Sequence, residues 1–105
     1  MSLSDDMMGS TTIVTSTLSK AAIYEQLAEE CVELAHACQK KARKLRGENP
    51  TPLEMDEIDE AVSEELTDVT LVSRILGLDC NLRMYWDKYD RWCSRLSENS
   101  LTDLS

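Results

Sequence analysis

The sequence is 105 residues long and carries 20 acidic against 11 basic side chains, which gives a formal net charge of -9. This length supports one small domain, and the acidic balance argues against a general nucleic-acid binder, because phosphate neutralisation needs an excess of Lys and Arg. No segment approaches the roughly 20 apolar residues of a membrane span, so we expect no membrane partner. Hydrophobic residues make up 42% of the chain, and only three Gly and two Pro supply turns. The composition therefore predicts an all-α fold built from a few long helices.

Residues 1–18 are rich in Ser, Thr, Asp and Met, and we predict a flexible N-terminal arm there. This arm has neither the basic nor the apolar region of a secretory signal. The ordered all-α domain is expected over residues 19–98, followed by a polar tail over 99–105 that frays.

The four cysteines are Cys31, Cys38, Cys80 and Cys93. Cys31 and Cys38 lie on one predicted helix, about 10 Å apart along its axis, which is too far for a disulfide. The sequence has no CxxC pair, and His36 has no partner at the spacing of zinc ligands. We therefore expect reduced thiols in the core of a cytoplasmic protein. His36 points away from the acidic residues of its helix, which predicts a surface position for it.

A first helix is predicted over about residues 20–46, with Ser19 as its N-cap and Gly47 at its end. Its apolar residues recur at helical spacing: Ile23, Leu27, Cys31, Leu34, Cys38 and Leu45. Five basic residues crowd its C-terminal end: Lys40, Lys41, Arg43, Lys44 and Arg46. Favourable interaction with the helix dipole explains them, and contact with a phosphorylated substrate is the alternative.

A second helix is predicted over about residues 52–76, because Thr51 and Glu54 form a capping box around Pro52. Its apolar stripe consists of Ile58, Ala61, Val62, Val69, Val72 and Leu76. A third helix over about 80–97, capped by Asp79, carries one apolar face made of Leu82, Tyr85, Trp86, Tyr89, Trp92, Cys93 and Leu96. The short loops predict an antiparallel bundle of long helices, completed by oligomerisation because the core is small.

Acidic residues interrupt two of these apolar stripes. Glu65 points to within roughly 20° of the centre of the second stripe, and Asp68 lies beside it. Glu30 and Glu33 lie at the edge of the first stripe, three residues apart and so on one face. An ionised carboxylate among aliphatic side chains costs several kcal/mol unless it is paired or binds a metal. Packing the two helices through their stripes would bring four carboxylates together.

Two explanations of these carboxylates follow from the residues. Lys or Arg from the third helix or from a neighbouring chain could neutralise them. Alternatively, a hard divalent cation could bind between them, and all-oxygen ligation favours Mg²⁺ or Mn²⁺ over zinc. Two acidic pairs on adjacent helices favour the metal site.

At these residues the sequence resembles the MazG-like, all-α nucleoside triphosphate pyrophosphohydrolases, which carry E-E-x-x-E on one helix and E-x-x-D on the next. The first motif reads Glu29-Glu30-Cys31-Val32-Glu33, and the second reads Glu65-Leu66-Thr67-Asp68. The resemblance extends over about residues 20–97 and includes the segment Gln26-Leu27-Ala28.

This resemblance implies Mg²⁺-dependent hydrolysis of a nucleoside triphosphate between its α and β phosphates, by a homodimer or homotetramer. It also implies Glu30, Glu33, Glu65 and Asp68 as metal ligands, with Glu29 as a further ligand or a water-orienting base. Bound cations would meet the triphosphate, so such an enzyme can be acidic overall.

The third helix offers candidate substrate contacts in Asn81, Lys88 and Arg95, which recur every seven residues beside its aromatic face. A solvated flank explains this row equally well, and the aromatic face is typical of a core or a subunit interface. Two other functions remain open. One is a non-enzymatic module that binds a partner through the Trp/Tyr face, and the other is a hydrolase for a different phosphorylated substrate.

Overall fold

The computed structural model describes residues 12–48 and 52–104 of the chain, the side chains of 100–104 excepted. Three long helices dominate it, namely α2 over Lys20–Arg46, α3 over Met55–Ile75 and α4 over Leu82–Leu104. A short helical segment over residues 12–17 precedes α2, and the described residues include no strand. The prediction of an all-α fold is therefore confirmed. No helix in the described part of the chain is long and apolar enough to cross a membrane.

The bounds of α2 agree with the prediction, and both predicted end signals act as expected. The Ser19 hydroxyl accepts a hydrogen bond of 3.1 Å from the backbone N–H of Ala22, which satisfies one free donor at the helix start. Gly47 follows the last turn with φ of 71°, a left-handed conformation that favours glycine. The basic residues of the last turn stabilise this end of the helix dipole.

The starts of α3 and α4 differ from the predictions. Helix α3 begins at Met55 rather than near Pro52, and Glu54 is its N-cap without a side-chain hydrogen bond. Thr51, the first residue of the predicted capping box, lies outside the described residues. Helix α4 is capped by Asn81 and not by Asp79, since the Asn81 side chain accepts a 3.0 Å bond from the Met84 N–H.

Two polar segments that we expected to be irregular are helical where the structure describes them. Residues 1–11 of the predicted arm lie outside the described residues, whereas 12–17 form a helical segment in which Ser16 and Thr17 bond to carbonyls four residues earlier. At the other end, α4 continues to Leu104 instead of fraying after Glu98. No Gly or Pro occurs between residues 82 and 104, so nothing in the sequence stops the helix there.

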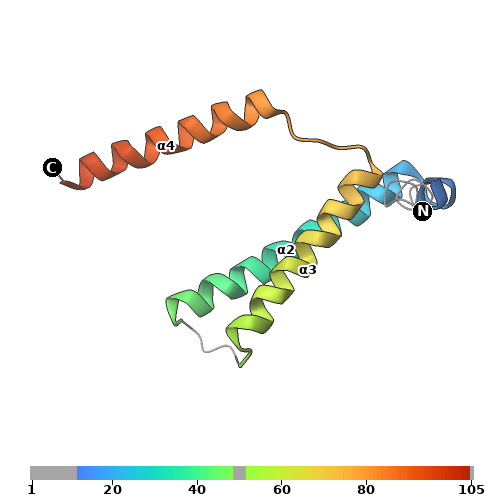
Figure 1. Cartoon of the computed structure of the whole chain (residues 1–105), viewed down its shortest axis with the longest axis horizontal. Coiled ribbons are helices and arrows are strands. Elements are labelled where there is room, and N and C mark those ends of the chain that lie inside the picture. The colour runs from blue at the N-terminus through green and yellow to red at the C-terminus, as the bar shows by residue number, and fades with distance from the viewer. Residues whose placement is uncertain (1–11, 49–51, 105) are drawn as a thin grey trace, which may run out of the picture.

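Helices α2 and α3 form an antiparallel hairpin and pack along their lengths (Figure 1). The core of the hairpin is small, because only Ile23, Ile58 and Val72 are buried among the described hydrophobic residues. Gly77, with φ of 70°, ends α3, and an extended connection then carries α4 away from the hairpin (Figure 1). Helix α4 makes no comparable packing with α2 or α3. The chain by itself therefore does not form the three-helix bundle that its loops suggested.

The packing also corrects two predictions about which residues are in the core. The four cysteines are free, as expected, but all four are exposed rather than buried. In α2, Ile23 is buried and Leu27 and Leu34 are half-buried, whereas Cys31, Cys38 and Leu45 are exposed. His36 is exposed, which confirms its predicted surface position.

Candidate metal centre

Three carboxylates from the two hairpin helices converge within the hairpin. One oxygen from each of Glu30, Glu65 and Asp68 lies within 4.8 Å of the other two, and all three residues are half-buried. Glu65 and Asp68 are three residues apart on α3, so they share a helix face, while Glu30 reaches them from α2. Two oxygens on one Mg²⁺, with bonds of about 2.1 Å, lie at most about 4.2 Å apart. Small side-chain rotations would therefore let the three carboxylates share one hard cation.

The position of Glu65 follows from the heptad spacing of α3. Ile58 lies seven residues before it and Val72 seven residues after it, and both are buried against α2. Because seven residues make about two helical turns, Glu65 occupies the same row between them. The core row of α3 thus has a carboxylate at its middle, as the sequence predicted.

The electrostatic surroundings of Glu65 are unfavourable to its ionised form. Desolvation is the largest cause that raises its pKa above the ordinary value of 4.5, and Asp68, Glu33, Glu30 and Glu64 raise it further. Every charged group named there is another carboxylate. Within residues 12–48 and 52–99, no Lys or Arg forms an ion pair with Glu30, Glu65 or Asp68; Lys41 instead pairs with Asp59. The ion-pair explanation therefore has no support within the described chain.

Gln26 is a site residue that the sequence reasoning did not identify. Its side-chain amide donates a hydrogen bond of 2.7 Å to Oε1 of Glu30, one turn further along α2. This bond fixes the orientation of one carboxylate oxygen and leaves the other free to bind a cation. The spacing of four residues between Gln26 and Glu30 was the available signal, because such pairs meet on a helix surface.

The two remaining acids of the first motif lie at the edge of the centre. Glu33 is exposed and its carboxylate is not one of the three that converge, yet its charge contributes to the raised pKa of Glu65. Glu29 is also exposed, on the solvent side of α2. Glu33 therefore lies between the three converging carboxylates and solvent, and it is not one of the predicted ligands that the structure brings together.

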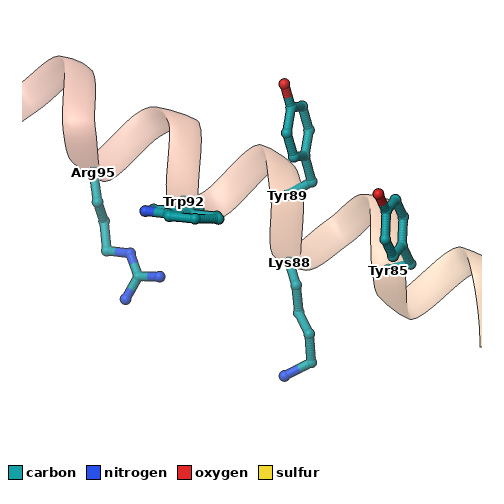
Figure 2. A pocket seen from close by; sticks show the side chains of 5 residues that line it. All are labelled: Tyr85, Lys88, Tyr89, Trp92 and Arg95. Carbon is teal, nitrogen blue, oxygen red and sulfur yellow. The ribbon is translucent and has the colours of Figure 1, made fainter. Parts of the chain in front are cut away.

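The structure does not bring the predicted substrate contacts to this centre within one chain. Asn81 is engaged as the cap of α4. Lys88 and Arg95 line a hollow of about 420 Å³ on α4 together with Tyr85, Tyr89 and Trp92. Figure 2 shows the Lys88 and Arg95 side chains extending from one side of α4, while the ring of Tyr89 points to the opposite side. Since α4 does not pack on the hairpin, these cations and the carboxylates belong to separate parts of the chain (Figure 1).

Comparison of the chain with known protein families, curated proteins and solved structures finds no match.

Proposed function

We propose that the protein is a Mg²⁺-dependent nucleoside triphosphate pyrophosphohydrolase that releases a nucleoside monophosphate and pyrophosphate. The observation that carries this proposal is the convergence of Glu30, Glu65 and Asp68 without a basic partner among the described residues. The motif resemblance supplies the reaction type. Four free cysteines fit a reducing, cytoplasmic location.

The residues present fit a hard divalent cation, with Mn²⁺ as an alternative to Mg²⁺. Carboxylate oxygens are the ligands that both ions prefer, and three of them leave coordination positions for water and phosphate oxygens. When bound, the cation would offset the charge of the triphosphate and lower the pKa of a coordinated water. Gln26 would hold Glu30 in its binding orientation through the 2.7 Å hydrogen bond.

The reaction consumes one water molecule. Its oxygen bonds to phosphorus, the anhydride bond between the α and β phosphates breaks, and pyrophosphate leaves. The proton of the attacking water needs an acceptor close to the centre. Glu33, which is exposed and near Glu65, is best placed for that role, and Glu29 is the second candidate.

Lys88 and Arg95 would contact a triphosphate at this centre only in an assembly that brings α4 to a hairpin. The expected dimer or tetramer is therefore part of the proposal. The half-exposed aromatic residues of α4 support it, since Trp86 and Trp92 are 57% and 59% exposed in the single chain.

A panel of canonical and modified nucleoside triphosphates, assayed for both phosphate products, tests the reaction. We expect pyrophosphate as the primary product from at least one substrate, and complete loss on chelation of the metal. Asp68→Asn should abolish this activity, whereas Asp79→Asn removes an exposed carboxylate from the connection before α4 and should leave it intact. Orthophosphate as the primary product would contradict the proposed position of cleavage.

The exposed aromatic face of α4 favours one alternative, a non-enzymatic module that binds another protein through Tyr85, Tyr89 and Trp92. On this alternative no nucleotide would be hydrolysed, and Mg²⁺ would leave the thermal stability unchanged. Mg²⁺-induced stabilisation without turnover of any nucleoside triphosphate would instead favour a different phosphorylated substrate.

A further inference from the structure

Helix α2 carries two apolar stripes, of which the structure buries only one. The buried stripe contains Ile23, Leu27 and Leu34 and faces α3. A second stripe is formed by the residues that come one position after the buried row along the chain. It consists of Tyr24, Ala28, Cys31, Ala35, Cys38, Ala42 and Leu45. One residue corresponds to about 100° around a helix, so this Ala/Cys stripe lies beside the interface with α3. All of its residues are exposed except Ala42, which is half-buried.

The Ala/Cys stripe lies away from the candidate metal centre. Glu33 is three residues after the inward-facing Glu30, and on the helical wheel it falls on the other side of the buried stripe. A surface that covered Ala28, Cys31 and Ala35 would therefore leave the solvent approach past Glu33 open.

Helix α4 presents the complementary surface. Its apolar face follows a heptad spacing through Leu82, Tyr85, Tyr89, Trp92 and Leu96, and each of these side chains is about half exposed or more. The apolar residues of α4 and the small residues of α2 both recur at intervals of three and four. The large rings of one helix can therefore pack over the small side chains of the other. The α4 face is about 21 Å long at 1.5 Å per residue, and the Ala/Cys stripe is about 32 Å long.

We propose that α4 of one copy docks along the Ala/Cys stripe of α2 in a second copy, and that the two copies exchange their α4 helices reciprocally. The bulky rings would pack over Ala28, Cys31, Ala35 and Cys38, where small side chains let the helix axes approach. This interface does not depend on the chemistry proposed for the carboxylates.

A second copy fits this surface better than the other occupants. The connection after Gly77 is extended and directs α4 away from its own hairpin (Figure 1), so docking in a partner keeps the observed conformation whereas folding back reverses it. Pairing two α4 helices would set rings against rings and hold their axes apart. Docking α4 on α2 also avoids pairing two acidic hairpins. Helix α3 contains seven acidic residues and a single basic one, Arg74, so two such helices would repel each other.

The area involved is sufficient for a stable dimer. Aromatic side chains carry about 150–250 Å² each, and those of α4 are about half exposed. Two exchanged α4 faces and the surfaces that they cover would therefore bury roughly 2,000 Å² in total, the upper end of a standard stable interface.

The native cysteines allow a direct test. Cys93 lies on the apolar face of α4, and Cys31 and Cys38 lie on the Ala/Cys stripe; all three are exposed in the single chain. Protein labelled with heavy nitrogen is mixed with unlabelled protein, equilibrated and treated with a short bismaleimide, and the linked peptides are identified by mass spectrometry. We expect links from Cys93 to Cys31 or Cys38 that join a heavy to a light chain. Links only within one chain would show folding back, links between two Cys93 residues would show pairing of α4 helices, and either result overturns the proposal.

Charge insertion provides the second test, read as oligomeric state by sedimentation. Ala35→Glu and Trp92→Glu each place a carboxylate in the interface and should raise the dimer dissociation constant by about 100-fold or more. His36→Glu and Ser94→Glu add the same charge outside the two apolar faces and should leave the dimer unchanged. Helicity measured by circular dichroism shows that each variant is folded. A monomeric wild-type protein, or equal effects of the interface and control variants, would overturn the proposal.

Discussion

The hairpin and α4 are both amphipathic, yet only the hairpin buries its apolar face within the chain. Ile23, Ile58 and Val72 pack between α2 and α3, whereas α4 has no buried residue over positions 82–99. Helices α2 and α3 pack against each other, while an extended connection separates α4 from both. Amphipathic spacing thus identifies the face that a helix can bury, but the chain connection decides whether the same chain covers that face.

Each region also contains side chains whose surroundings in the single chain are energetically unfavourable. In the hairpin these are the carboxylates of Glu30, Glu65 and Asp68, which lie half-buried without a basic partner in the described chain. In α4 they are aromatic side chains such as Trp86 and Trp92, which are about half exposed. Both arrangements are unfavourable in the single chain, because unpaired charge and exposed apolar area each cost free energy.

The largest expected effect concerns the centre of the hairpin. Glu65→Gln keeps the shape of the side chain and removes its charge, so it should lower turnover by about 100-fold or more. It should also remove most of the stabilisation by Mg²⁺, which for the wild type reaches about 2.7 kcal/mol at 100 times the dissociation constant. Thermal melts with and without Mg²⁺ and a pyrophosphate assay measure both quantities.

Glu64→Gln is the matched control, because Glu64 is the exposed neighbour of Glu65 and does not belong to the three converging carboxylates. It should retain both the metal-induced shift and the turnover. If Glu65→Gln behaves in the same way as this control, Glu65 is not a metal ligand.

The next effect contrasts a buried hairpin residue with an exposed residue of α4. Ile58 is 1% exposed, and Ile58→Ala should destabilise the hairpin by about 2–5 kcal/mol, with Ile58→Val costing about 0.5–1.5 kcal/mol. Trp86→Ala should leave the unfolding of the hairpin unchanged at protein concentrations low enough to keep the chain monomeric. Chemical denaturation of the dilute proteins checks this, and equal losses for Ile58→Ala and Trp86→Ala would show that α4 belongs to the core of the monomer.

A smaller effect is expected in the pH dependence of the metal-free protein. The pKa of Glu65 is raised in the folded state, so the folded chain binds a proton more readily than the unfolded chain. This group therefore lowers stability as pH rises from the ordinary value of 4.5 through the raised folded value, and the loss persists at higher pH. Glu65→Gln should flatten this part of the stability curve, measured as melting temperature against pH in the presence of a chelator. A curve with the same slope in wild type and variant would contradict the raised pKa.

The smallest effect belongs to the ion pair between Lys41 and Asp59 near the loop end of the hairpin. The two side chains are partly exposed, and Asp59→Asn should cost about 0.2–1 kcal/mol, decreasing with added salt. Asp56→Asn removes an exposed acid one turn earlier and serves as the control. Urea denaturation at low and high salt separates the two variants, and a loss that salt leaves unchanged would show that the pair contributes by something other than charge.

Much of the helical framework and of the candidate metal centre could be predicted from local patterns. Ser19 and Gly47 gave the ends of α2, because capping depends on residues within one turn. The position of Glu65 in the core row followed from helical spacing, and its partner Glu30 followed from packing the two stripes together. The extra length of α4 did not follow from its polar composition, because polar residues do not end a helix in the absence of a terminating Gly or Pro.

The sequence by itself determined that this protein is helical, where its long helices lie and which carboxylates interrupt their apolar rows, since these properties depend on neighbours within a few residues. Only the tertiary structure decided which of the two stripes on α2 is buried, that Glu33 lies outside the three converging carboxylates, and that α4 stands apart from the hairpin. The physical reason is that two adjacent rows on α2 both carry apolar residues, and contacts with another helix, α3, decide which of the two rows is buried. For α4, the direction of the connection after Gly77 makes that choice, and it leaves the aromatic face uncovered within the single chain.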